Sequence, residues 1–137
     1  NKIEIKDKEN FNNYDYKLDN EVNLELGKIY MIDSTDIVKS NYLIRLNFKD
    51  IKLPIHVRNR IVGDKLELKN GTKKVGEILS EAKINKLDRD RYPIVCDDNN
   101  KILWIPGVKK SKFDRQINED YDIIIKYMKK ESNDEKK

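Results

Sequence analysis

The sequence has 137 residues, of which 37% are apolar and 39% are charged, with a formal net charge of +4 at pH 7. This length fits one domain, and the charged fraction exceeds the ~25% of an average soluble domain, so we expect a modest core beneath a densely charged surface. One cysteine excludes an internal disulfide, one histidine and one cysteine exclude a usual structural zinc site, and no apolar run approaches the roughly 20 residues of a membrane span. We therefore expect a cytoplasmic protein with neither a metal nor a membrane partner.

Short strands are predicted in the first part of the chain. Apolar and polar residues alternate over short runs between residues 14 and 48, a pattern typical of half-buried strands. Breaks in the pattern fall at Gly27 and at the polar stretch 33–36. We expect residues 1–50 to form a strand-rich lead-in that belongs to the same domain as the residues that follow.

The middle of the chain combines strands and turns with one main helix. A strand is predicted over 52–57, and Pro54 inside it favours an edge position or a bulge, because proline donates no hydrogen bond to a ladder. After the turn at Asn70-Gly71, Thr72 is a suitable N-cap, and the apolar residues that follow recur at helical spacing. We predict the main helix from Lys73 to Ala82.

Strands return in the last third. A short helical turn is predicted over 87–91, and the apolar runs 94–96 and 102–105 flank a polar turn, which predicts a hairpin. β-branched residues favour a strand over 121–128, and the charged tail 131–137 is expected to be disordered. The fold class predicted from these elements is a β-rich α+β domain with a layered β-sheet core and one main helix.

No set of residues forms a catalytic constellation. Asp97 and Asp98 are adjacent carboxylates, but they occupy the hairpin turn, where aspartate is favoured for backbone reasons. We interpret Cys96 as a small buried hydrophobe and His56 as structural. Trp104 lies between apolar neighbours, which favours core packing over base stacking. The glycines form no phosphate loop, and no serine lies in a nucleophile elbow.

Positive charge gathers in the middle and late parts of the chain. Residues 1–50 hold 8 Lys and Arg against 10 Asp and Glu, whereas residues 57–92 hold 10 against 6 and residues 101–115 hold 5 against 1. A charge run is usually a solvated face, but basic groups that recur in one region favour a nucleic-acid partner.

The basic residues differ in how strongly they indicate a phosphate contact. Lys73 and Lys74 are expected on the first turn of the main helix, where free N–H groups and the helix dipole favour phosphate, although a plain turn with solvated lysines fits equally well. In the segment 89–91 an aspartate separates two arginines, so pairing within the segment competes with phosphate binding. The predicted RNA-binding set is Arg58, Arg60, Lys65, Lys73, Lys74, Arg89, Arg91, Lys109, Lys110 and Ser111.

Four ordered runs of residues resemble the C-terminal domain of tRNA(Ile)-lysidine synthetase, and their order and spacing hold over roughly residues 54–112. The runs are Val57-Arg58-Asn59-Arg60-x-x-Gly63-Asp64-Lys65, Gly71-Thr72-Lys73-Lys74, Arg89-Asp90-Arg91-x-Pro93-Ile94-Val95 and Ile102-Leu103-Trp104-Ile105-Pro106-Gly107-Val108-Lys109-Lys110-Ser111. Two positions depart from the family's pattern: Asn85 stands where proline is usual, and Gly76 stands where a basic residue is common.

The resemblance implies that residues 51–130 are a non-catalytic tRNA-recognition domain. The parent enzyme would be an ATP-dependent ligase that joins lysine to the wobble cytidine of an isoleucine tRNA. ATP and Mg would belong to an N-terminal catalytic domain that this chain lacks, so no cofactor is expected here and the fragment alone should be inactive. The implied partners are isoleucine tRNA, on its acceptor-stem side, and that catalytic domain. The implied fold is similar to a domain of the phenylalanyl-tRNA synthetase β subunit.

Two other classes of function remain open. The chain could be a docking or dimerisation module of the same enzyme, forming a homodimer, which an exposed apolar patch of several hundred Å² would favour. It could instead be an independent small enzyme, which a concave pocket with perturbed titratable residues would favour. A continuous basic face would favour RNA.

Overall fold

The computed structural model describes residues 13–33 and 36–130; the predicted tail 131–137 and the start of the lead-in lie outside the described residues. The elements in chain order are β1 (Asp15–Lys17), β2 (Glu21–Asn23), β3 (Gly27–Ile32), β4 (Leu43–Leu46), the 3-10 helix η1 (Phe48–Asp50), β5 (His56–Asn59), β6 (Lys65–Leu68), β7 (Gly71–Lys74), α2 (Val75–Glu81), α3 (Lys86–Arg91), β8 (Pro93–Cys96), β9 (Ile102–Ile105), β10 (Lys109–Lys110) and β11 (Ile123–Lys129).

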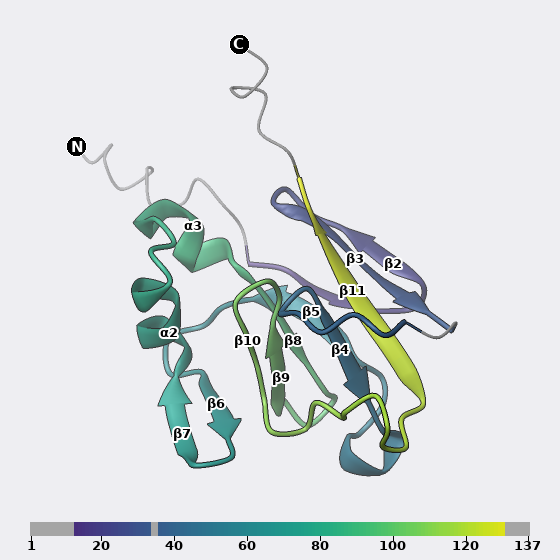
Figure 1. The fold of residues 1–137 in the computed structure, drawn as a ribbon. Coiled ribbons are helices and arrows are strands. Elements are labelled where there is room, and N and C mark those ends of the chain that lie inside the picture. The colour runs from purple at the N-terminus through teal and green to yellow at the C-terminus, as the bar shows by residue number, and fades with distance from the viewer. Residues whose placement is uncertain (1–12, 34–35, 131–137) are drawn as a thin grey trace, which may run out of the picture.

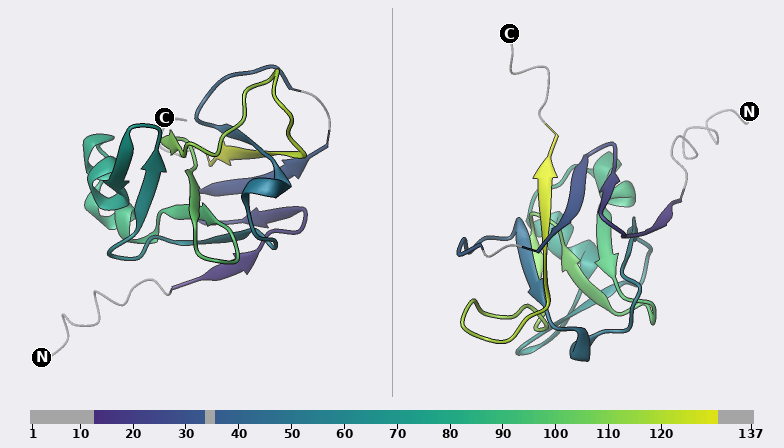
Figure 2. Two further views of the ribbon diagram at one scale, coloured as in Figure 1. Left: turned by 90° about the horizontal axis from the view of Figure 1, so that it is seen from below. Right: turned by 90° about the vertical axis from the view of Figure 1, so that its right-hand side faces the viewer.

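The strands form three antiparallel sheets. One sheet has the order β1-β5-β8-β9-β10, a second has the order β2-β3-β11-β4, and β6 and β7 form a separate hairpin. Figure 1 shows the β6–β7 hairpin and both helices along one side of the molecule, with β5, β8 and β9 between them and the four-stranded sheet. The views in Figure 2 agree with this layered arrangement. The β-rich fold with layered sheets and few helices is therefore confirmed.

The central strands β5, β8 and β9 of the five-stranded sheet are buried, with an apolar cluster on each face of the sheet. One apolar cluster lies between the two larger sheets and includes Trp104 with Ile29 and Ile125. The other cluster packs α2 and β6 against the opposite side, with Leu66 and Leu79 among its members. Burial on both faces explains why β8 and β9 read as continuous apolar runs. A buried aromatic side chain removes about 150–250 Å² from water, worth about 4–6 kcal/mol, so Trp104 is a main element of this core.

Several sequence predictions are confirmed. The hairpin is β8–β9, the short helical turn is α3, and the late strand is β11. Trp104 is fully buried and Cys96 is 2% exposed, as expected for core residues. In the part of the chain that the structure describes, none of the helices is long and apolar enough to cross a membrane.

The predicted main helix over Lys73 to Ala82 is wrong in two respects: the helix begins later, and it is not the single main helix. Gly71–Lys74 is strand β7, paired with β6, and α2 begins only at Val75 with Lys74 at the N-cap position. Thr72 therefore lies within a strand, and its hydroxyl caps no helix. With 7 residues in α2 and 6 in α3, the described residues contain two short helices of similar length and no single main helix.

Two predictions about breaks and edges are also wrong. Gly27 does not interrupt the strand pattern; it opens β3 and pairs with Lys129 of β11. A Cβ at Gly27 would come within 2.5 Å of the Met128 carbonyl oxygen, so this close pairing requires glycine. Pro54 precedes β5 instead of lying in it, and β5 is flanked by β1 and β8, so it is not an edge strand.

Candidate nucleic-acid interface

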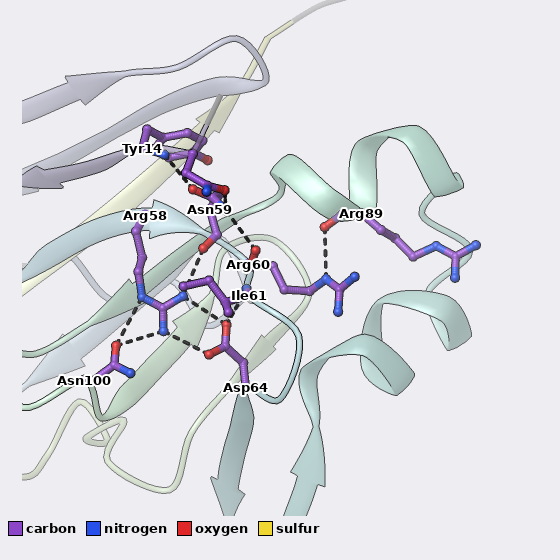
Figure 3. Close-up of polar contacts among 9 residues, drawn as sticks. Tyr14, Arg58, Asn59, Arg60, Ile61, Asp64, Arg89 and Asn100 are labelled. Carbon is purple, nitrogen blue, oxygen red and sulfur yellow. Dashed lines mark hydrogen bonds and ion pairs between the residues drawn. The ribbon is translucent and has the colours of Figure 1, made fainter. Parts of the chain in front are cut away.

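Arg58 is buried, at 4% exposure, and the chain itself uses all five of its N–H donors (Figure 3). Nη1 and Nη2 donate to the two carboxylate oxygens of Asp64, both at 3.0 Å. Nε and Nη2 donate to Asn100 Oδ1 at 3.2 and 2.9 Å, and Nη1 also donates to the Asn59 carbonyl at 2.9 Å. Burial acts to lower the pKa of Arg58, and the Asp64 carboxylate outweighs it, so the pKa is raised. A guanidinium has five donors, so none is left for a phosphate, and this geometry disfavours the predicted RNA contact at Arg58.

Arg60 lies between β5 and α3 and is also engaged. Its Nη2 is 3.0 Å from Asp90, its Nε donates to the Arg89 carbonyl at 3.2 Å, and its side chain is 15% exposed. A Cβ at position 76 would come within 3.2 Å of Arg60 Nη1, so Gly76 leaves the space over α2 that this guanidinium occupies. Arg60 therefore joins α3 to the end of β5.

The two arginines of α3 differ. Arg91 pairs with Asp88 at 2.8 Å and with Glu25 at 2.5 Å, and the Asp88 hydrogen bond raises its pKa. Asp90, which lies between these two arginines in the chain, pairs with Arg60 and with neither of them. Arg89 has no carboxylate partner among the described residues, and its Nε is buried without a hydrogen bond. Figure 3 shows its guanidinium pointing away from Arg58.

The β6–β7 hairpin brings lysines together. Lys65 and Lys74 are directly opposite partners in the ladder, and both are exposed. Side chains of such partners lie on the same face with Cβ atoms about 4.5–5.5 Å apart, where like charges repel. Neither lysine has a carboxylate within ion-pair distance in the described ranges. The base of the hairpin thus carries two adjacent positive charges that no ion pair among the described residues offsets.

A hollow of about 400 Å³ next to the hairpin is lined by three lysines: Lys69, Lys73 and Lys109. Lys109 comes from β10, at the edge of the five-stranded sheet. Lys73 pairs with Glu81 at 2.6 Å, but their side chains are 37% and 64% exposed, and such surface pairs contribute only about 0–1 kcal/mol. A phosphate could therefore take the place of Glu81 at little cost.

We call the residues of this region the lysine surface, which consists of Lys65, Lys69, Lys73, Lys74 and Lys109. The hollow brings together Lys73 and Lys109 of the ten predicted site residues and adds Lys69, which precedes the Asn70-Gly71 turn but was not in the predicted set, whereas Lys65 and Lys74 lie opposite each other at the base of the same hairpin. Lysine at the turn itself was the sequence signal that could have identified Lys69.

Lys110 and Ser111 are not brought to this surface. Lys110 pairs with Asp114 at 3.3 Å, with a side chain that is 18% exposed. Ser111 is 5% exposed, and its Oγ accepts a hydrogen bond from the Phe113 amide at 3.2 Å. Both side chains contribute to the loop after β10, and their burial disfavours the predicted RNA contact.

Outside the lysine surface, the notable polar groups shape the backbone. The Asp97 carboxylate, on a residue that is 2% exposed, accepts hydrogen bonds from the amides of Lys52, Asn99 and Lys101 at 2.9–3.0 Å. Asp97 therefore orders the β8–β9 turn, in agreement with the turn interpretation of its sequence. Within residues 13–33 and 36–130, no group of three or more His, Cys, Asp or Glu side chains is placed to hold a metal ion.

These features define a β-rich domain with a cationic surface built from a strand hairpin and a sheet edge. The family model described as the TilS substrate C-terminal domain matches residues 55–123. The chain therefore belongs to the TilS C-terminal domain family, as its sequence resemblance predicted.

Individual relatives agree with this assignment. The chain is 40% identical over 105 residues to the bifunctional protein TilS/HprT of Listeria innocua, covering 74% of this chain and 15% of the relative. It is 53% identical over 68 residues to the tRNA(Ile)-lysidine synthase of Geobacillus kaustophilus, covering 48% of this chain and 15% of that enzyme. A crystal structure of a TilS C-terminal domain superposes with a TM-score of 0.77 at 35% identity, covering 88% of this chain and all of that one. The chain thus spans about 15% of the length of these two curated relatives.

Proposed function

We propose that this domain recognises tRNA and that the lysine surface is its RNA-binding site. The observation that carries the proposal is the contrast between the two kinds of basic residue. Three of the four predicted arginines are paired with carboxylates of the chain, whereas Lys69 of the β6–β7 turn, Lys73 of β7 and Lys109 of β10 line one hollow, and Lys65 and Lys74 are exposed at the base of the same hairpin. Lysine supplies non-directional charge, which suits the phosphate backbone of RNA.

The names of the relatives supply the substrate class. We propose that the parent protein is a tRNA(Ile)-lysidine synthase, a cytoplasmic ligase that uses ATP and Mg to join lysine to the wobble cytidine of an isoleucine tRNA. Its ATP site, its Mg site and its chemistry would lie in a separate catalytic domain, the second partner of this one. This fragment would then be inactive alone. A fold shared with the phenylalanyl-tRNA synthetase β subunit remains part of this proposal.

The acceptor-stem side of the tRNA is the proposed target. A-form RNA hides its major-groove base edges, so proteins contact its phosphates, its 2′-hydroxyls and its exposed ends. A hairpin with four lysines beside Lys109 of β10 fits contacts to phosphates better than it fits reading of base edges. A domain that grips tRNA away from the anticodon would also raise the effective concentration of the anticodon at the catalytic domain.

Binding of the chain to an isoleucine tRNA transcript and to a length-matched unrelated tRNA tests this proposal. We expect micromolar or weaker affinity that falls steeply as salt rises, because lysine–phosphate contacts release counterions. Lys73→Ala and Lys109→Ala should each lower the slope of log K against log salt by about 1. Lys17→Ala is the matched control, because Lys17 is exposed on β1, at the opposite edge of the five-stranded sheet from β10.

The outcome that would contradict the proposal is absence of binding to either tRNA at low salt. The docking or homodimer alternative would then be tested by sedimentation of the chain alone and with the catalytic domain. The comparisons do not favour that alternative.

A further inference from the structure

The base of the β6–β7 hairpin is closed by a single residue, Asp64. It immediately precedes β6, and its carbonyl oxygen accepts a hydrogen bond from the Val75 amide, which immediately follows β7, at 2.9 Å. Its carboxylate also accepts from the Ile61 amide at 2.9 Å, which fixes the turn before the hairpin. Asp64 therefore contacts the entry and the exit of the segment that carries four lysines.

Arg58 fastens this base to the centre of the five-stranded sheet. It lies on β5, between β1 and β8, and its bidentate pair with Asp64 is nearly closed to water, with side chains 5% and 8% exposed. The same guanidinium binds Asn100 in the β8–β9 turn, a residue with a φ of 63°. Arg58 therefore links the base of the hairpin, through Asp64, to the β8–β9 turn, through Asn100 (Figure 3).

The lysine surface needs such a link. Lys65 and Lys74 repel each other across the ladder, and this repulsion favours opening of the hairpin base on which they lie. A bidentate Arg–carboxylate pair resists this opening with fixed geometry, because both partners have rigid planar groups. Asp64 of this pair adjoins Lys65, the first lysine of the hairpin, and bonds to Val75, which follows Lys74, the last.

We propose that Arg58, Asp64 and Asn100 form a buried clasp that positions the lysine surface for tRNA, and that Arg58 itself does not contact the RNA. This inference rests on the proposed function. It assigns Arg58 and Asp64 the role of positioning residues, although the sequence places both beside the lysines as if all were parts of one binding loop.

Two simple consequences separate a clasp from a contact. Loss of a phosphate contact lowers the slope of log K against log salt by about 1, whereas loss of a positioning residue weakens binding and leaves the slope unchanged. In addition, Asp64→Asn makes the domain more positive next to the lysines. Electrostatics alone predicts tighter tRNA binding for this variant, and the clasp predicts weaker binding.

The experiment measures tRNA affinity across a salt series for the full chain, Asp64→Asn and Arg58→Gln. Asp36→Asn is the matched control, because it also removes a carboxylate from an ion pair, with Lys126 at 2.7 Å, but on the four-stranded sheet. We expect about tenfold weaker binding for both clasp variants, equivalent to about 1.4 kcal/mol, with an unchanged slope. The control should stay within about twofold of the parent chain.

Amide hydrogen exchange distinguishes a loosened hairpin from an unfolded domain. We expect faster exchange at Val75 and in β7 of the clasp variants, with protection retained at Trp104 in β9. If Asp64→Asn fails to fold, Asn100→Ala provides a milder variant. It should also weaken tRNA binding and leave the salt slope unchanged. A slope lowered by about 1 in Arg58→Gln, or parent-like affinity in a folded Asp64→Asn, would overturn the clasp. If the parent chain binds no tRNA, the proposed function itself is refuted. The parent chain thus tests the proposed function, and the differences between parent and variants test the clasp.

Discussion

Stability should fall as pH rises through the titration of His56, the one histidine of the chain. Its Nδ1 lies 2.8 Å from Asp15 and its Nε2 lies 2.8 Å from Asp98, which joins β1 and the β8–β9 turn to β5. Only the protonated ring can donate from both nitrogens. The hydrogen bonds to Asp98 and Asp15 raise the pKa of His56 above its ordinary value, against a smaller opposing effect of burial.

The sign and the upper limit of the effect follow from proton linkage. Below about pH 6.5 the folded and unfolded chains both hold the His56 proton, so the full stabilisation is present. Between the unfolded and the folded pKa values the folded chain holds one more proton. The free energy of unfolding then falls by at most about 1.4 kcal/mol per pH unit, and the contribution is lost above the folded pKa.

Urea unfolding of the chain and of His56→Gln between pH 5.5 and 8 measures this effect. Carboxylates titrate below this window, and burial raises the pKa of the Cys96 thiol to about 11, so His56 is the main side chain expected to titrate. We expect stability to decrease with pH in the parent and to stay level in His56→Gln. A level parent profile, or stability that rises with pH, would refute the double ion pair.

Three further predictions concern single side chains. Gly76→Ala should raise the free energy of unfolding by roughly 1 kcal/mol in an Arg60→Ala background, because alanine favours the helix. In the parent chain the gain should be smaller, because the new Cβ meets Arg60 Nη1. Urea unfolding measures both gains, and equal gains would contradict the contact. Lys74→Glu should stabilise the domain by about 0.2–1 kcal/mol at low salt by relieving the repulsion from Lys65, and should weaken tRNA binding. Thermal melts and a binding titration check both effects, and a variant that gains stability without losing affinity would remove Lys74 from the site. The buried Cys96 thiol should react with a thiol reagent only as fast as the domain opens, so its rate should rise with urea, and a rate equal to that of an exposed thiol would be inconsistent with its burial.

The parts of the fold that the sequence predicts are those with a local pattern. The two apolar runs around a polar turn are enough to predict the β8–β9 hairpin and the burial of Trp104. The start of α2 was missed because Gly71–Lys74 has no strong preference and is a strand only through its pairing with β6. The Asn70-Gly71 pair is itself a hairpin signal, and it competes with the helical spacing that follows it.

The site was predicted only in part, because basic residues look alike in a sequence. Arg58 and Lys74 are both cations near a glycine turn, yet one is buried and the other exposed. Their difference depends on Asp64 and on Asn100, which lies 42 residues beyond Arg58 in the chain and reaches it only in the folded sheet. A resemblance to a family places such residues in one motif, but it does not distinguish residues that contact RNA from residues that hold those in position.

The central claim, that the lysine surface contacts tRNA, is tested most directly by lysine footprinting. The folded chain would be acetylated briefly with and without tRNA, and the modified positions would be read by mass spectrometry. We predict that tRNA protects Lys65, Lys69, Lys73, Lys74 and Lys109 and leaves Lys17, at the far edge of the sheet, as reactive as before. Equal protection of all exposed lysines, or protection centred on Lys17, would contradict the account.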